Sequence, residues 1–277
     1  MFAPCALRAA TAVRVVGSQL MEPLIEDAAQ ILRSENNIQV QIVPGAGISA
    51  ALMALEEQKA DVVMVSRAIV PADHADHPAI TFNEIQIGEQ IVAFGVARDV
   101  WAGGVHALTR EQLKAIYESK ITNWRAVGGA DQKIAFFNFE EGQSGVWELF
   151  AQWLYGDTRR APAGRFQVVS TFAEARDTVE FTAGAMVLIS PLLVDGQRSF
   201  ALAIKEADGK TSEPTPQAAL AKTYPLARPL LLVTNDKPTG RTKVLVDFLL
   251  SARGQELLKK RGFYGADAIK QAGGEAR

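Results

Sequence analysis

The sequence predicts an α/β fold, and three observations support this prediction. Short apolar runs alternate with amphipathic helical segments through the first quarter or so of the chain. Turns rich in glycine and serine separate these runs from the helices that follow them. One run, Val62–Val65, is apolar at every position, as in strands that are buried on both faces of a parallel sheet. Together these patterns indicate consecutive βαβ units.

The composition narrows the class of protein. The chain has 277 residues, which suits one large domain or two modest ones, and 48% of them are hydrophobic, enough for a sizeable core. The net charge of -2 argues against a nucleic-acid-binding or membrane-surface protein. No apolar run approaches the ~18 residues that a membrane-spanning helix needs. Cys5 is the one cysteine, so an intrachain disulfide is excluded, and we expect a free thiol in a frayed tail.

The N-terminal segment Met1–Ala12 lacks the full apolar core of a signal peptide. It could be the tail of an export signal or a misplaced start, and the sequence leaves both open.

The first elements follow in regular order. Val13–Val16 predicts a strand, and Ile38–Ile42 predicts a second one by its alternation. Between them, apolar residues recur at helical spacing through about Ser34. A further helix, with Leu52 and Leu55 on one face, precedes the strand Val62–Val65.

Each of these three strands is followed by a turn or helix start that holds a serine: Ser18, Ser49 and Ser66. In an open α/β sheet, ligands bind beyond the carboxyl ends of the strands. Three hydroxyl groups at three such ends therefore predict a small-ligand site at one edge of the sheet.

The segment Pro71–Pro78 contains two histidines and two aspartates, which could ligate a metal. We interpret it instead as a solvated acidic loop, because flanking prolines offer no fixed ligand geometry. We expect no metal site, and we assign no function to the third histidine, His106.

The middle of the chain begins with two extended runs, Ile80–Ile87 and Gln90–Ala97, and a break at Trp101–Gly104. The sequence Thr109–Gln112 is a capping box that opens a helix.

The stretch Asn138–Trp147 follows a short apolar run and leads into an amphipathic helix that ends at Gly156. The N-terminus of a helix presents unpaired N–H groups and a partial positive charge, and glycines let a ligand approach them. Ser144 could therefore help to bind a small anion, or it could only cap the helix.

The last third predicts a helix over Phe172–Thr182, a strand over Ala185–Ile189 and an exposed loop over Gly209–Gln217. A strand over Pro229–Thr234 and two helices follow, the final one ending near Arg261.

The chain resembles a known family through motifs that occur in a particular order. These motifs are Gly17–Ser18, Pro44–Gly47, Ala60–Arg67, Leu108–Leu113, Lys120–Trp124, Glu141–Gly145, Tyr224–Pro229 and Asp247–Ser251. In this respect it resembles the phosphate-binding type of periplasmic solute-binding protein, the receptor of an ABC importer.

The resemblance implies a two-lobed periplasmic binding protein type II fold, with mixed sheets flanked by helices and a hinge of two crossing strands. Lobe one would comprise residues 13–96 plus 224–277, and lobe two residues 97–223. Ligand would be held in a cleft between the lobes, which would close by a hinge motion.

The resemblance also implies a set of ligand-binding residues and no cofactor. These residues are Ser18, Gln19, Leu20, Gly47, Ser49, Ser66, Arg67, Gln143, Ser144 and Gly145. The chain departs from the family pattern at Gln19 and Val146, where threonine is usual, and at Asn138 and Phe139, where an arginine is usual just upstream. If Arg67 neutralises an anion, its replacement by alanine should abolish binding with little change in melting temperature.

We therefore expect an extracytoplasmic receptor, periplasmic and with a membrane anchor left open, that captures phosphate or a related small oxyanion. Its partners would be the anion and an ABC permease, and it would be a monomer that binds no nucleic acid. An alternative is the same fold with a cleft altered for a less charged or organic ligand, or for sensing through a partner protein. We do not expect an enzyme, because Gly142–Val146 lacks the final glycine of a nucleophile elbow and no P-loop lysine is present.

Overall fold

A computed structural model describes residues 12–43, 47–139, 145–157, 160, 164–206 and 208–275. Contacts divide the chain into two compact units. Unit 1 comprises Met1–Ile87 and Pro229–Leu257, and unit 2 comprises Gly88–Arg228 and Leu258–Arg277. Two strands, β4 (Phe82–Ile91) and β12 (Ala227–Asn235), run from one unit into the other.

The sequence-based lobes assign the C-terminal segment to lobe one, whereas the contacts assign Leu258–Arg277 to unit 2. The reason is local pairing: β13 (Tyr264–Gly265) pairs with β4 at Glu89 and Gly88, and α11 (Ala266–Glu275) packs against α8 (Pro216–Leu220). The lobe boundaries themselves stay a prediction.

The sheet that contains the first strands has the order β13-β4-β12-β3-β1-β2. Here β1 is Val13–Gly17, β2 is Val40–Val43 and β3 is Val62–Val65. Strand β1 pairs in parallel with both β2 and β3, and β12 pairs antiparallel with β3. The predicted mixed sheet flanked by helices is confirmed.

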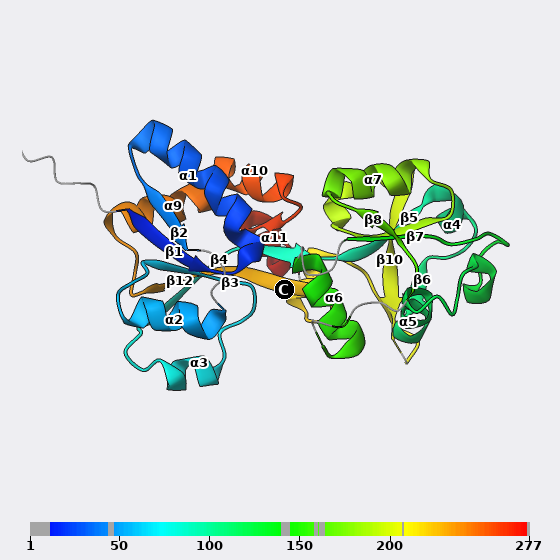
Figure 1. The fold of residues 1–277 in the computed structure, drawn as a ribbon, viewed down its shortest axis with the longest axis horizontal. Helices are drawn as coiled ribbons and strands as arrows, with labels where there is room; N and C mark the ends of the chain where they lie inside the picture. Colours follow the sequence, from blue (N-terminus) through cyan, green and yellow to red (C-terminus); the bar gives the residue numbers. More distant parts are fainter. Residues whose placement is uncertain are drawn as a thin grey trace, which may run out of the picture. The chain divides into compact units, whose positions relative to one another are not determined.

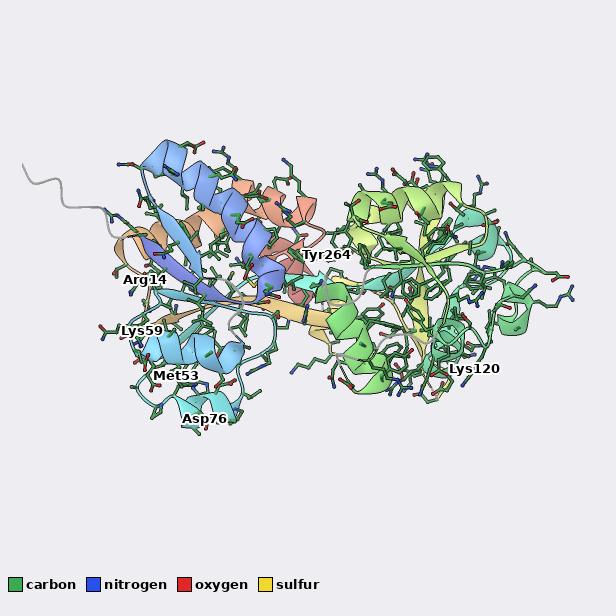
Figure 2. All side chains as sticks on the ribbon, viewed as in Figure 1. Arg14, Met53, Lys59, Asp76, Lys120 and Tyr264 are labelled. Carbon is green, nitrogen blue, oxygen red and sulfur yellow. The ribbon has the colours of Figure 1, made fainter. Side chains whose placement is uncertain are left out.

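Helices cover both faces of this sheet in unit 1 (Figure 1). They are α1 (Glu22–Asn36), α2 (Ile48–Glu56), α3 (Pro71–Asp76), α9 (Gly240–Leu250) and α10 (Ala252–Lys260). A 3-10 turn, η1 (Gln19–Met21), precedes α1. In α2 the apolar face packs Leu52 and Leu55 against β3, while Met53 lies on the outer side of the helix (Figure 2).

The interpretation of Pro71–Pro78 as a loop was wrong, because Pro71–Asp76 forms α3. Proline suits the first helical position, where its missing N–H costs nothing. The carboxylate of Asp73 accepts a hydrogen bond from the backbone N–H of Val70 at 2.8 Å, which stabilises the start of the helix. His77 is buried and its Nδ1 lies 2.9 Å from Oε2 of Glu56.

Unit 2 is built on a seven-stranded sheet with the order β11-β10-β5-β9-β7-β8, and β6 pairs with β10 beside this path. Its strands are β5 (Ala93–Ala97), β6 (Ala107–Thr109), β7 (Ala135–Phe139), β8 (Gln167–Val169), β9 (Ala185–Ile189), β10 (Ser199–Lys205) and β11 (Thr211–Ser212). Strand β7 runs parallel to β8 and β9, whereas β5 is antiparallel to β9 and β10.

The helical segments of unit 2 are α4 (Arg98–Ala102), α5 (Arg110–Tyr117), η2 (Trp124–Val127), α6 (Gly145–Tyr155), α7 (Phe172–Phe181) and η3 (Pro191–Leu193), besides α8 and α11. The predicted capping box of α5 is confirmed. Thr109 N donates to Gln112 Oε1 at 2.9 Å, and Gln112 N donates to Thr109 Oγ1 at 3.2 Å.

Three expectations for elements were wrong. The break at Trp101–Gly104 begins inside α4, and the loop predicted over Gly209–Gln217 holds β11 and the start of α8. Thr215 caps α8 by accepting a hydrogen bond from Ala218 N, so a Pro/Thr/Ser-rich composition here starts a helix. The last helix is α11, beyond the predicted end near Arg261.

Within the described ranges, every helix falls short of the length and apolar character that a bilayer crossing requires.

Candidate functional site

The carboxyl ends of β1, β2 and β3 lie at one edge of the unit 1 sheet (Figure 1). The register pairs Gly17 with Met64 and Val16 with Val43, so the three strands end close together. Ser18 follows β1 directly and Ser66 follows β3 directly. Two of the predicted hydroxyl groups therefore extend from neighbouring strand ends, as the sequence pattern indicated.

Ser18 and Ser66 are in contact. The Ser18 hydroxyl donates to Ser66 Oγ at 3.2 Å, and the Ser18 backbone N–H donates to Met64 O at 3.0 Å. Gly17 permits this approach: its φ is +128°, and a Cβ there would lie 2.3 Å from Met64 O. Since both serines are only half-buried, their hydroxyl groups keep access to a ligand.

Two helical segments begin beside these strand ends. The turn η1 starts at Gln19 and leads into α1, and α2 starts at Ile48 after Gly47. Neither start has a side-chain cap, and the first N–H groups of a helix have no partner within the helix. The predicted site residues Gln19 and Leu20 belong to η1, and Ser49 is exposed in the first turn of α2. These starts can donate backbone hydrogen bonds to an anion.

Arg67 is engaged by a carboxylate within unit 1. Its Nη1 and Nη2 donate to the two carboxylate oxygens of Asp73 at 2.7 and 2.8 Å, and Nη1 also donates to Ala68 O at 2.7 Å. The hydrogen bonds from Arg67 lower the pKa of Asp73 to about 2 and raise the pKa of Arg67 itself. The pair is therefore an ionised, internally neutralised unit, and a ligand role for Arg67 stays a prediction.

A polar pocket of about 340 Å³ lies at the other end of the unit 1 strands, near the starts of β1 and β3. Its charged lining includes Arg14, Asp61 and Lys237. Arg14 donates through Nε and Nη2 to both oxygens of Asp61, at 3.0 and 2.7 Å. Burial would raise the pKa of Asp61, but these hydrogen bonds lower it below its usual value. Because the two charges satisfy each other, this pocket is a weaker candidate than the carboxyl edge.

The sequence predicts three site residues in unit 2: Gln143, Ser144 and Gly145. Gln143 and Ser144 are outside the described residues, so their contribution stays a prediction. Gly145 is the first residue of α6, which follows β7 along the chain. The backbone of Gly145 thus stands at a helix N-terminus, as the sequence predicted.

Asn138, on β7, is a polar residue that we did not include in the predicted site. Its exposed fraction is 0%, and within the part of the chain that the structure describes, neither Oδ1 nor Nδ2 has a hydrogen-bond partner. The available signal was its place in a run that is otherwise apolar, Ile134–Phe139. A lone amide in a buried strand requires either a partner or a function.

No group of three or more metal-ligating side chains occurs among the described residues. In the segment weighed as a metal site, Asp73 is bound by Arg67 and His77 by Glu56. Cys5 lies outside the described residues.

Comparison with known proteins gives one matching family model, described as a PBP superfamily domain, over residues 6–253. The phosphate-binding protein PstS of Bacillus subtilis (strain 168) is 26% identical over 248 residues, which cover 88% of this chain and 77% of that protein.

Two solved structures are also similar. An ABC-type phosphate transport receptor from Vibrio cholerae is 27% identical with a TM-score of 0.67, and the match covers 92% of this chain and 99% of that one. A substrate-binding protein from Clostridium perfringens with bound phosphate is 26% identical with a TM-score of 0.58, over 92% of this chain and 100% of that one.

Proposed function

The chain belongs to the PBP superfamily, and from this premise we propose that it captures phosphate or a closely related small oxyanion for an ABC-type importer. One observation of the structure supports this proposal above the others. Two helical segments without side-chain caps and two contacting serines occur at one edge of a sheet in unit 1. The similar proteins named above are a phosphate-binding protein, a phosphate transport receptor and a protein with bound phosphate.

The chemistry of a small oxyanion fits these groups. A dianion that leaves water loses strong hydration, so many donors must replace it. Hydroxyl groups and the N–H groups of helix starts provide such donors without adding a full charge. Candidate contacts in unit 1 are Ser18, Gln19, Leu20, Gly47, Ser49 and Ser66, with Arg67 beside them; in unit 2 they are Gln143, Ser144 and Gly145.

A less charged or organic ligand is the second candidate, and one observation favours it. Both terminal nitrogens of Arg67 donate to Asp73, so the cation that follows Ser66 in the chain is already neutralised. A site that relies on neutral donors has less electrostatic reason to require a dianion.

Thermal-shift measurements on the whole chain distinguish the two candidates. The panel contains phosphate, sulfate, molybdate, phosphonates and small organic acids. A ligand that binds only the folded state adds about 2.7 kcal/mol at ~100 times its dissociation constant. We expect the largest rise in melting temperature with phosphate. A rise with organic acids alone would select the second candidate, and no rise with any compound would leave a sensing role.

The transport role implies an ABC permease as partner and an extracytoplasmic location, with no catalytic step. Complementation tests this part: expression in a bacterium that lacks its own phosphate receptor should restore high-affinity phosphate uptake. If the protein is exported and folded but phosphate uptake is not restored, the receptor serves another partner.

A further inference from the structure

The strongest unexplained feature of unit 2 is the side chain of Asn138. It is completely buried on β7, and within the described ranges both polar atoms of its amide lack a protein partner. A buried amide without a partner destabilises the folded state, so native proteins rarely retain one without a reason. Its neighbours on the strand, Phe137 and Phe139, are also buried, so solvent at the sheet surface does not account for it.

The contacts of the neighbouring aromatic residues show which face of the sheet Asn138 shares. Side chains alternate along a strand, so Asn138 lies on the same face as Phe136. The Phe136 ring lies 4.5 Å from the Tyr117 ring of α5, and Tyr117 lies 4.3 Å from the Phe150 ring of α6. Phe139, on the other face, contacts Phe172 of α7 at 5.3 Å. Asn138 therefore belongs to the face that α5 and α6 cover.

The start of α6 follows the same end of the strand along the chain. The chain leaves β7 at Phe139 and begins α6 at Gly145, so the helix starts from the carboxyl end of β7. Asn138 is the penultimate residue of that strand. The helix has 11 residues, and its first N–H groups form the positive end of its dipole. A buried amide and a helix N-terminus thus occur at one strand-to-helix junction.

We propose that Asn138 is a ligand-contacting residue, whose Nδ2 donates a hydrogen bond to an oxygen of a small oxyanion bound at the start of α6. This inference rests on the proposed anion-binding function and adds a residue to it. The amide supplies a donor without a charge, in the strand that precedes the helix. Binding of the ligand then satisfies a group that has no partner in the described part of the chain.

A purely structural role makes the opposite prediction for one substitution. Asn138→Leu replaces the amide with an apolar side chain of similar size. If Asn138 is only an unsatisfied buried group, or is hydrogen-bonded by a buried water, then the variant keeps its affinity for anions. If Asn138 contacts the ligand, the variant loses affinity while its ligand-free fold is retained or stabilised.

The test measures phosphate binding by titration calorimetry and the ligand-free melting temperature by circular dichroism, both on the full chain. For Asn138→Leu we expect phosphate affinity to fall roughly 10- to 100-fold, the range for a hydrogen bond to a charged acceptor. The melting temperature without ligand should stay equal or rise.

Ser212→Ala is the matched control. Ser212 is also buried in unit 2, at 7% exposed, and its hydroxyl also lacks a partner among the described residues. Ser212 lies on β11, at one end of the sheet, and three strands separate β11 from β7. We expect its affinity for phosphate to stay within about twofold of the wild type, as for a polar group remote from any ligand.

Three outcomes separate this inference from the function on which it rests. If the wild type binds phosphate and Asn138→Leu binds it with the same affinity, the role of Asn138 is overturned and the proposed function stands. Absence of phosphate binding by the wild-type chain overturns both. If Asn138→Leu does not fold, the wild-type protein labelled with ¹⁵N-asparagine decides by NMR: the side-chain amide signals of Asn138 should shift on phosphate addition, and unchanged signals overturn the inference.

Discussion

The polar side chains at the ends of β1 in unit 1 and β7 in unit 2 differ in burial and in hydrogen bonding. Along the chain, β1 is followed by η1 and α1, and β7 is followed by α6. At the first junction Ser18 is half-buried and contacts another hydroxyl, that of Ser66. At the second, Asn138 is fully buried and its amide lacks a partner in the described part of the chain. The first arrangement satisfies its hydroxyl groups within the protein, whereas the second leaves a buried amide for which we propose a ligand partner.

The charged groups of unit 1 extend this comparison. Arg67 is held by Asp73, and at the other edge of the sheet Arg14 is held by Asp61. Both cations are therefore neutralised within the protein. Among the described residues at the carboxyl ends of β1 and β3, neutral donors such as Ser18 and Ser66 remain available. At the proposed site we therefore expect ligand selection to depend on hydrogen-bond geometry more than on net charge.

Gly17→Val should have the largest effect on the first junction. The substitution places a β-branched side chain at φ +128° and within 2.3 Å of a backbone oxygen, so β1 or β3 must move. We expect a loss of more than about 3 kcal/mol in the free energy of unfolding, measured by urea denaturation. Retention of wild-type stability would mean that the Ser18 contact does not depend on Gly17.

Gly47→Ala is the control for Gly17→Val. A Cβ at Gly47 meets nothing within 4 Å, and its φ of -57° is open to any residue. We expect a change below about 1 kcal/mol, since this position precedes α2 and alanine is a poorer N-cap than glycine. A large loss there would show that the glycines at this edge are equally constrained.

Some residues of the candidate site could be predicted from the sequence and others could not. Strand ends were predictable at Ser18 and Ser66 because each serine follows an apolar run directly. Asn138 was harder to predict, because its one signal was a polar residue inside an apolar run, and a single buried amide adds no periodic signal. The Arg67–Asp73 pair was also missed, since Pro71–Asp76 has too little apolar periodicity to indicate a helix. Helix α11, with two glycines near its end, lacked a comparable helical signal.

The Arg67–Asp73 pair predicts a pH dependence of stability of intermediate size. The pKa of Asp73 is about 2 in the folded protein, below the reference value of 3.8, so folding favours the ionised carboxylate. Its contribution is complete above pH 4 and is lost as the pH falls towards 2. Because the Arg67 side chain is 40% exposed, solvent screening limits the contribution to on the order of 1 kcal/mol.

Urea denaturation of the wild type and of Asp73→Asn between pH 2 and pH 5 measures this contribution. The free energy of unfolding of the wild type should fall more steeply with decreasing pH than that of the variant. Arg67→Ala should remove the same slope and should also lower the melting temperature. This differs from the sequence-based expectation of little change, because the substitution leaves the buried carboxylate of Asp73 without its cation. Parallel slopes in all three proteins would mean that the pair contributes nothing in solution.

The Ser18–Ser66 contact should give the smallest effect, and a double-mutant cycle can resolve it. The hydroxyl groups are 3.2 Å apart and half-buried, so water competes for both. We expect Ser18→Ala and Ser66→Ala each to lower the free energy of unfolding by about 0.5–1 kcal/mol, with a coupling of a few tenths. The effect of Ser49→Ala on the free energy of unfolding, at an exposed position in α2, should add to that of Ser18→Ala without coupling.

If Ser18 and Ser66 also donate to the ligand, the same cycle measured on phosphate affinity should show a larger coupling than the cycle measured on unfolding. Equal couplings in the two cycles would limit the contact to a structural role and would leave the helix starts as the donors of this edge.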